Sequence, residues 1–193
     1  MIKIGLTGGI GTGKSVVAGI FSGMGIPIFF ADQEAKKAYS DLEVLQKIKV
    51  LFGESIFDNQ SVNFIKLSNL IFSNKIELEK LNDIIHPFVL QKFENWITEN
   101  SSAPYVIMES AILYETGYDT MFDKMIAVTA PTELCIERVM QRDGIDRDMV
   151  LKRMSNQFPN ETKVDRADFC VQNNSQELIA PQVADIHKSI LSL

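Results

Sequence analysis

Short apolar runs alternate with helix-length segments along the chain. Five of these runs are rich in isoleucine, valine and phenylalanine, and they occupy residues 2–6, 26–31, 105–108, 125–128 and 169–171. Continuous apolar runs of this length are typical of strands in a parallel sheet that helices cover on both faces. The pattern therefore predicts an α/β fold with a five-stranded parallel sheet.

Between the second and third runs, residues 32–100 show helical spacing and no convincing strand. Their apolar residues recur mostly at steps of three and four, and include Leu67, Leu70, Ile71, Leu78, Leu81, Ile85, Val89, Phe93 and Ile97. We expect a helical insertion that covers a bound substrate. A helical layer that only completes the core fits the same periodicity equally well.

The second half of the chain also contains two helical stretches. Residues 132–158 predict helix with an interruption at Asp143-Gly144, and residues 176–193 predict one amphipathic helix. We expect a single domain. Its core comprises residues 1–31, 101–131 and 159–193, its insertion residues 32–100, and its helical lid residues 132–158.

The strongest chemical signal lies directly after the first predicted strand and directly before a predicted helix. It is the P-loop pattern Gly8, Gly9, Ile10, Gly11, Thr12, Gly13, Lys14 and Ser15, followed by Val16. Glycines let successive main-chain N–H groups point at phosphate oxygens, and the helix amino end adds a favourable dipole. Lys14 is expected to reach the β- and γ-phosphates, and the Ser15 hydroxyl to bind Mg²⁺.

This motif predicts a three-layer P-loop NTPase fold that binds ATP and Mg²⁺. The alternative is a glycine turn with a chance lysine. That alternative requires the glycines, the lysine, the serine and the strand–helix setting to coincide by accident.

Carboxylates follow the second and third predicted strands, at the sheet edge where ligands of open α/β folds bind. Asp32 is placed to accept the proton of an attacking hydroxyl or to hold a magnesium-bound water. Capping of the following helix is an equally good interpretation of Asp32. Glu109 ends the third strand and Glu115 lies beyond it, and either carboxylate suits a magnesium shell.

Arg138 and Arg142 are four residues apart, hence on one helical face, and they precede the Asp143-Gly144 break. Guanidinium groups on a closing segment would neutralise charge that develops on a transferred phosphoryl group. A solvated helix face with acidic neighbours is the alternative. His86 precedes a proline inside a helical pattern. A capping or packing role in a kinked helix and a contact with a ligand are equally good interpretations of this histidine.

Composition limits the classes of function. Among 193 residues, 25 acidic and 19 basic side chains give a net charge of −6, which argues against a nucleic-acid or anionic-membrane partner. No apolar run approaches the ~20 residues that a membrane span needs. The spacing of Cys135 and Cys170 indicates neither a disulfide framework nor a zinc site. We expect both to be small buried residues of a protein in a reducing compartment. We expect a cytoplasmic protein, with the monomer as its state.

Taken together, the motifs resemble the dephospho-coenzyme A kinase family over nearly the whole chain. The resemblance is carried by residues 6–15, Ala31-Asp32, Ile85-His86-Pro87, residues 111–115, residues 138–143, Gln157, Ala167-Asp168 and Asn173. The P-loop alone indicates only a nucleotide, whereas the ordered set of smaller motifs is specific.

The resemblance implies phosphorylation of the ribose 3′-hydroxyl of dephospho-CoA by ATP. It implies these roles: catalytic base for Asp32, phosphate and magnesium ligands for Lys14 and Ser15, lid arginines for Arg138 and Arg142, and adenine contact for Asn173. It also implies that the helical insertion binds CoA, with Asp32, His86 and Glu115 as substrate contacts.

A few positions depart from the family pattern. The family's Asp-Ala-Asp is Phe-Ala-Asp at residues 30–32, so one acid is missing, and we hypothesise that Glu109 compensates for it. Val16, Ala111 and Ser175 stand where threonine, proline and glycine are usual. None of these changes removes a group that is assigned to the chemistry.

Two rival functions share part of this sequence evidence. Another small-molecule or nucleoside monophosphate kinase would use the same loop, helical cover and arginines. A GTP-dependent switch would need guanine-reading residues, and the nearest string, residues 74–77, ends in glutamate and follows no predicted strand.

Overall fold

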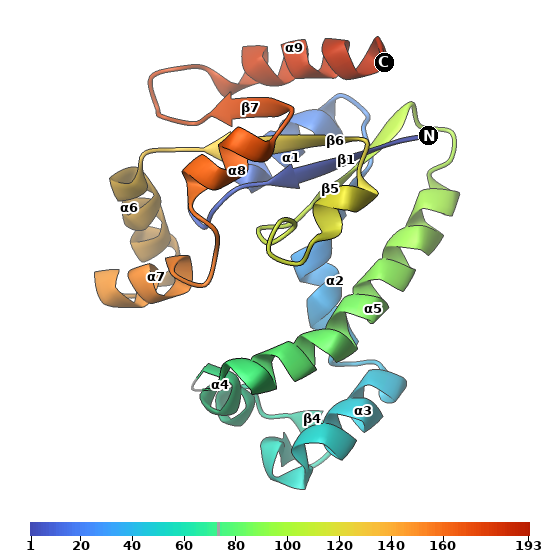
Figure 1. Cartoon of the computed structure of the whole chain (residues 1–193), viewed down its shortest axis with the longest axis vertical. Coiled ribbons are helices and arrows are strands. Elements are labelled where there is room, and N and C mark those ends of the chain that lie inside the picture. Colours follow the sequence, from blue (N-terminus) through green and yellow to red (C-terminus); the bar gives the residue numbers. More distant parts are fainter. Residues whose placement is uncertain (73) are drawn as a thin grey trace. The chain divides into compact units, whose positions relative to one another are not determined.

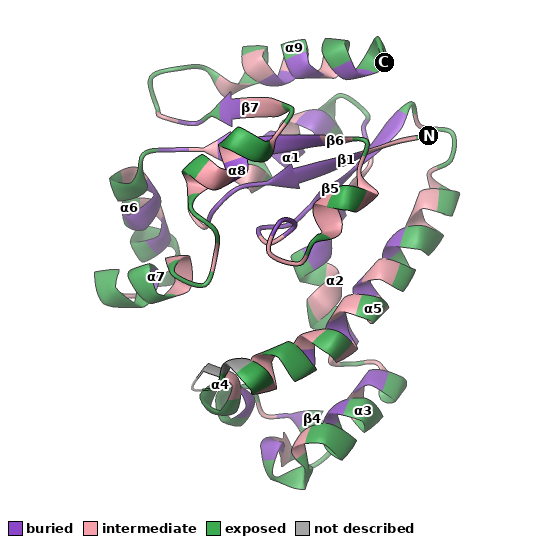
Figure 2. Ribbon diagram, viewed as in Figure 1, coloured by how far each residue is buried: buried purple, intermediate pink, exposed green. Residues whose placement is uncertain are grey.

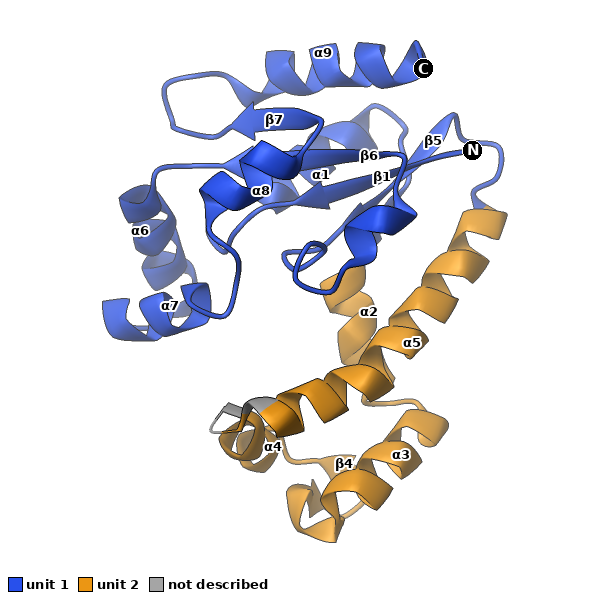
Figure 3. Ribbon diagram, in the orientation of Figure 1, with its two compact units in different colours: residues 1–30, 100–193 blue, residues 31–99 orange. Residues whose placement is uncertain are grey.

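A computed structural model of the chain describes residues 1–72 and 74–193 and divides into two compact units. Unit 1 comprises Met1–Phe30 and Asn100–Leu193, and unit 2 comprises Ala31–Glu99 (Figure 3). The two units have different architectures. Unit 1 is built on a parallel sheet, and unit 2 is almost entirely helical.

Unit 1 contains, in the described part of the chain, a five-stranded sheet with the order β2-β5-β1-β6-β7 (Figure 1). Its strands are β1 (Ile2–Thr7), β2 (Ile28–Phe30), β5 (Tyr105–Glu109), β6 (Lys124–Thr129) and β7 (Phe169–Gln172). All neighbouring strands pair in parallel. The predicted α/β fold is confirmed, and the five predicted strands differ from these by only one or two residues at their ends.

Helices α1 (Lys14–Gly23) and α9 (Ile179–Leu191) contact each other and share one core cluster with the sheet. Strands β1, β5 and β6 contribute alternate residues to this cluster, namely Ile4, Leu6, Tyr105, Ile107, Ile126 and Val128, and β7 adds Val171. Successive side chains of a strand point to opposite faces of the sheet, so residues two positions apart lie on the same face. Figure 2 shows that the strands of the sheet are largely buried. A further helix, α8 (Asn160–Arg166), contacts β6.

The chain after β6 forms two helices, α6 (Thr132–Asp143) and α7 (Arg147–Met154). Gly144 ends α6, so the predicted interruption is confirmed. Ile136 and Val139 of α6 pack with Val150 of α7 in a small core cluster. A short 3₁₀ turn, η2 (Tyr118–Met121), lies between β5 and β6.

Unit 2 is the segment that the sequence predicted to be helical. Its elements are α2 (Ala31–Ala38), α3 (Leu42–Phe52), η1 (Glu54–Ile56), β3 (Phe57–Asp58), β4 (Ser61–Val62), α4 (Phe64–Phe72) and α5 (Lys75–Glu99). The four-residue spacing in α5 is confirmed by the burial of Leu81, Ile85, Val89 and Phe93. No helix within residues 1–72 and 74–193 combines the length and apolar character that a membrane span requires.

The expectation that this segment lacks strands is wrong at one place. Strands β3 and β4 form an antiparallel pair of two residues each, in which Phe57 pairs with Val62 and Asp58 with Ser61. Asn59 adopts a left-handed φ of 58° in the turn, a conformation that asparagine tolerates better than most residues. Strands this short contain too few residues for an alternating pattern to be recognised.

The turn from β1 into α1 depends on two glycines. Gly11 and Gly13 have φ values of 82° and 92°, in the left-handed region that disfavours any side chain. A Cβ atom on Gly13 would overlap the Asn173 side chain, and one on Gly11 would overlap the main chain of Cys135. Both conformation and space therefore require glycine at these positions.

The variant Gly13→Ala is expected to lose about 1–3 kcal/mol of unfolding free energy, because its backbone is strained and its methyl group meets Asn173. Urea unfolding measures this loss. Gly19→Ala is the control, since Gly19 lies inside α1, the helix that follows Gly13, with open space around its Cβ position, and it should gain roughly 0.5–1 kcal/mol. Equal stability of the two variants would contradict the conformational requirement at Gly13.

Candidate active site

The amino end of α1 has the features of an anion site. Its first N–H groups have no carbonyl partner within the helix, and its N-cap residue, Gly13, provides no side-chain cap. In contrast, Asp41 caps α3 and Asp146 caps α7 through side-chain hydrogen bonds. The amino end of α1 is therefore suited to an external anion such as a phosphate group.

The ammonium group of Lys14 lies over the glycine turn. Its Nζ donates to the carbonyl oxygens of Gly8 (3.1 Å) and Gly9 (3.4 Å), and it lies 3.9 Å from Oε1 of Glu109. Both charged side chains are 11% exposed. The turn thus holds one cation directly beside the main-chain groups that follow β1.

Glu109 occupies the carboxyl end of β5, the strand that lies between β1 and β2. In the register of the sheet it is paired with Leu6 on one side and with Phe30 on the other. Phe30 stands where the family pattern has its first acid. Glu109 therefore lies beside Phe30 in the sheet, next to the position at which the family pattern has an acid that this chain lacks.

The residues at this edge fit a magnesium ion that is held mainly through phosphate oxygens. Ser15, in the first turn of α1, and Glu109 offer hydroxyl and carboxylate oxygens, the donors that Mg²⁺ prefers. The described residues contain no group of three or more His, Cys, Asp or Glu side chains that would hold a metal alone. Such an ion would need the oxygens of a bound nucleotide and water to complete its coordination.

Two side-chain amides contact the first half of the turn. The Oδ1 atom of Asn160 accepts a hydrogen bond from the N–H of Gly9, and Oε1 of Gln157 accepts one from the N–H of Ile10, both at 2.9 Å. These four residues also line a cavity of about 490 Å³ beside the turn. No motif in the sequence indicates a role for Asn160, and Gln157 is indicated only by the family pattern.

Arg138 and Asn173 contact the second half of the turn. Arg138 donates to the carbonyl of Gly11 (3.5 Å), to the carbonyl and Oδ1 of Asn173 (3.3 and 3.2 Å) and to the hydroxyl of Ser175 (3.2 Å). The buried Asn173 side chain in turn donates to the carbonyl of Thr12 at 2.8 Å. The structure therefore brings together two residues that the sequence assigned separately, and joins both to the P-loop main chain.

Arg142 differs from Arg138 in its surroundings. It is exposed, and its guanidinium bonds the carboxylate of the next residue, Asp143, at 2.7 and 3.1 Å. Asp143 also binds Arg153 at 2.7 Å. The hydrogen bond from Arg142 is the main cause that lowers the pKa of the Asp143 carboxyl.

Asp32 and His86 belong to unit 2. Asp32 lies in the first turn of α2 and is exposed; because α2 begins at Ala31, Asp32 is inside the helix and not at the capping position before it. His86 is half-buried in α5, and burial lowers the pKa of its imidazole, while the charge of Asp83 opposes this shift.

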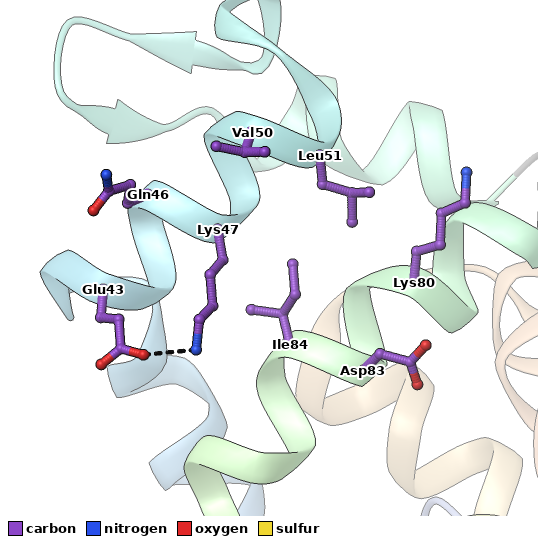
Figure 4. A pocket seen from close by; sticks show the side chains of 8 residues that line it. All are labelled: Glu43, Gln46, Lys47, Val50, Leu51, Lys80, Asp83 and Ile84. Atoms are coloured by element: carbon purple, nitrogen blue, oxygen red, sulfur yellow. Dashed lines mark ion pairs between the residues drawn. The ribbon is translucent and has the colours of Figure 1, made fainter.

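Unit 2 also contains a cavity of about 640 Å³ between α3 and α5 (Figure 4). It is lined by Glu43, Gln46, Lys47, Val50, Leu51, Lys80, Asp83 and Ile84. Its lysines already have acidic partners, since Lys47 pairs with Glu43 and Lys80 with Glu77. None of the predicted site residues lines this cavity.

Glu115 is bound to a residue that the sequence analysis missed. Its Oε1 atom lies 2.7 Å from Nζ of Lys163, a lysine of α8 that is fully buried. Burial lowers the pKa of Lys163, and the hydrogen bond and charge of Glu115 oppose the shift. Lys163 lies in a short stretch rich in charged residues, so neither periodicity nor spacing could have distinguished it from a surface lysine.

A parallel α/β sheet, a glycine turn between its central strand and the next helix, and a lysine over that turn define the class of P-loop kinases. Residues 2–178 match the family model for dephospho-CoA kinase. The chain belongs to the dephospho-CoA kinase family, and the resemblance found in the sequence is confirmed.

Individual relatives agree with this assignment. A dephospho-CoA kinase from Porphyromonas gingivalis is 38% identical over 192 residues, covering 98% of this chain and 95% of the relative. One from Bacteroides fragilis is 36% identical over 186 residues, with 96% and 91% covered. The crystal structure of TT1252 from Thermus thermophilus aligns with a TM-score of 0.86 and 31% identity, over 99% of this chain and 96% of that one.

The contacts of the two arginines predict different effects on stability. Arg138→Met should lose about 1–3 kcal/mol of unfolding free energy, because it leaves the buried Asn173 and the carbonyl of Gly11 without their donor. Arg142→Met is the control and should unfold almost as the wild type, since its partner is exposed to water. Urea unfolding compares the two variants. Equal losses of unfolding free energy would contradict a role of Arg138 in holding the P-loop and Asn173 in place.

Proposed function

We propose that the protein transfers the γ-phosphoryl group of ATP to the ribose 3′-hydroxyl of dephospho-CoA and so forms CoA and ADP. Membership of the dephospho-CoA kinase family supports the choice of acceptor. The observation that carries the proposal is the placement of Lys14, whose ammonium group lies at the P-loop main chain beside Glu109. A lysine in this position is suited to the phosphates of a nucleotide.

In this proposal ATP is held mainly by the main chain. The N–H groups of Gly11, Gly13 and Ser15 bind phosphate oxygens. The ammonium group of Lys14 exchanges the carbonyls of Gly8 and Gly9 for the β- and γ-phosphates. Asn173, which is joined to the loop through Thr12, contacts the adenine. Preformed donors of this kind bind with little further loss of conformational freedom.

Magnesium bound to the phosphates neutralises part of their charge. Ser15 and Glu109 would hold this ion from unit 1, and Asp32 would hold it through a bound water. In this role Glu109 takes the place of the acid that Phe30 replaces, which the pairing of these two residues in the sheet supports.

Asp32 acts as the general base. Its carboxylate accepts the proton of the 3′-hydroxyl as the hydroxyl oxygen forms a bond to the γ-phosphorus. The bond between that phosphorus and the bridging oxygen of ADP breaks, and ADP leaves with the electron pair. Arg142, whose partner is an exposed neighbour, exchanges Asp143 for a phosphoryl oxygen, while Arg138 keeps the loop in place.

The acceptor is bound by the helical insertion, residues 32–100, with His86 as a contact. The enzyme acts as a monomer in this proposal. The substrates and the absence of a membrane-spanning helix among the described residues fit a cytoplasmic enzyme.

The function is tested by ADP release with a panel of acceptors. With ATP and Mg²⁺, dephospho-CoA should give stoichiometric ADP, whereas adenosine, AMP and shikimate should not. The Lys14→Ala variant is the control and should abolish the signal, because the phosphates lose their cation. Turnover of another acceptor in preference to dephospho-CoA would contradict the proposed substrate, and full activity of Lys14→Ala would contradict the P-loop assignment.

The role of Asp32 is tested by Asp32→Asn. Because Asp32 is exposed in the first turn of α2, this variant should fold normally, yet its turnover should fall by roughly 10²–10⁴ through loss of the general base. Glu34→Gln, in the same helical turn, is the matched control and should retain turnover. Near-normal turnover of Asp32→Asn in the steady-state assay would exclude Asp32 as the base.

A further inference from the structure

Lys163 is the buried charge that the proposed reaction does not use. It is completely shielded from solvent, and burial of an ammonium group is unfavourable unless it is paired and hydrogen-bonded. Lys163 meets both conditions: Nζ donates to the carbonyl of Ala111 and to Oε1 of Glu115. Both partners belong to the segment that follows β5, so Lys163 fixes that segment to α8.

Glu115 extends this contact to a third segment. The same Oε1 atom accepts a hydrogen bond of 2.7 Å from the main-chain N–H of Phe158. The other carboxylate oxygen, Oε2, is buried and has no hydrogen-bond partner among the described residues. One oxygen is thus already engaged by two donors and the other is closed off from solvent, which leaves Glu115 poorly placed to contact a substrate.

Phe158 belongs to a four-residue segment, residues 157–160, which we call the strap. The first and last residues of the strap bind the P-loop through their side chains. Gln157 accepts a hydrogen bond from the N–H of Ile10, and Asn160 accepts one from the N–H of Gly9. A Cβ atom on Gly9 would lie 2.5 Å from Oδ1 of Asn160, so the strap fits closely against the turn. Hydrogen bonds therefore link Lys163 to Glu115, Glu115 to the strap, and the two ends of the strap to the P-loop, entirely within unit 1.

We propose that Lys163 and Glu115 are a positioning pair. They hold the strap against the P-loop, and the strap fixes Gly9 and Ile10 so that the N–H groups of the residues after them face the phosphates of ATP. This inference rests on the proposed function only in that ATP is the nucleotide. It assigns Glu115 to the ATP side of the reaction, although the family resemblance implies a substrate contact for it.

The test is direct titration of ATP, which does not depend on the identity of the acceptor. Isothermal titration calorimetry gives the Kd of ATP with Mg²⁺ for Lys163→Met and Glu115→Gln, the second of which keeps an oxygen for the N–H of Phe158 but loses the charge. Each should raise Kd about tenfold, the weight of one lost hydrogen bond to phosphate. The double variant should be no worse than either single one, because the two residues act as a pair.

Kinetics separate this role from substrate contact. With dephospho-CoA as acceptor, both variants should raise the KM of ATP and leave the KM of dephospho-CoA nearly unchanged. Lys152→Met, an exposed lysine of α7, is the control and should match the wild type. A wild-type Kd for ATP in folded Glu115→Gln, or a rise confined to the KM of dephospho-CoA, would overturn the proposal.

Variants of the strap decide the question if the buried pair proves essential for folding. Gln157→Ala and Asn160→Ala leave Lys163 and Glu115 intact and should each raise the Kd of ATP in the same direction. An unchanged Kd in both variants would show that the contacts between the strap and the P-loop do not affect ATP binding. A lower Kd would show that the strap competes with phosphate for the N–H groups of Gly9 and Ile10, and either result would refute the positioning role.

Discussion

The turn that carries the chain from β1 into α1 is the constraint on which the rest of unit 1 depends. Gly11 and Gly13 must be left-handed for the main chain to leave the sheet and begin a helix at once. The result is a helix amino end without a side-chain cap, which concentrates N–H donors and positive potential at one point. Side chains from distant segments bind the same turn, through Arg138 and Asn173 on one half and through the strap on the other.

The segment after the end of β5 connects this turn to the surrounding core. Glu109 lies beside Lys14 of the P-loop, and six residues later Glu115 binds Lys163 of α8. One short stretch of chain thus provides the carboxylates of two ion pairs. The first involves Lys14 of the P-loop, and the second involves Lys163 in the core. Because a buried charge that loses its partner is strongly destabilising, these pairs tie the position of the loop to the integrity of the fold.

The sequence revealed the parts of the molecule that have a regular pattern. Apolar runs identified the five strands, and the three- and four-residue spacing of apolar residues predicted helix in the region that contains α5. The P-loop could be recognised because its glycines and Lys14 are adjacent. The β3–β4 pair was too short for any periodicity, and the contacts of Lys163 and Asn160 join residues up to 151 positions apart. Such contacts arise only from tertiary packing, so no local pattern records them.

The central claim is that the P-loop amides and Lys14 grip the triphosphate while Asp32 faces the acceptor hydroxyl. A crystal structure with a non-hydrolysable ATP analogue, Mg²⁺ and dephospho-CoA tests it most directly. The account predicts phosphate oxygens on the N–H groups of the turn and on Lys14 Nζ, with the Asp32 carboxylate within hydrogen-bond distance of the ribose 3′-hydroxyl. Phosphates bound elsewhere, or an Asp32 side chain directed away from that hydroxyl, would contradict it.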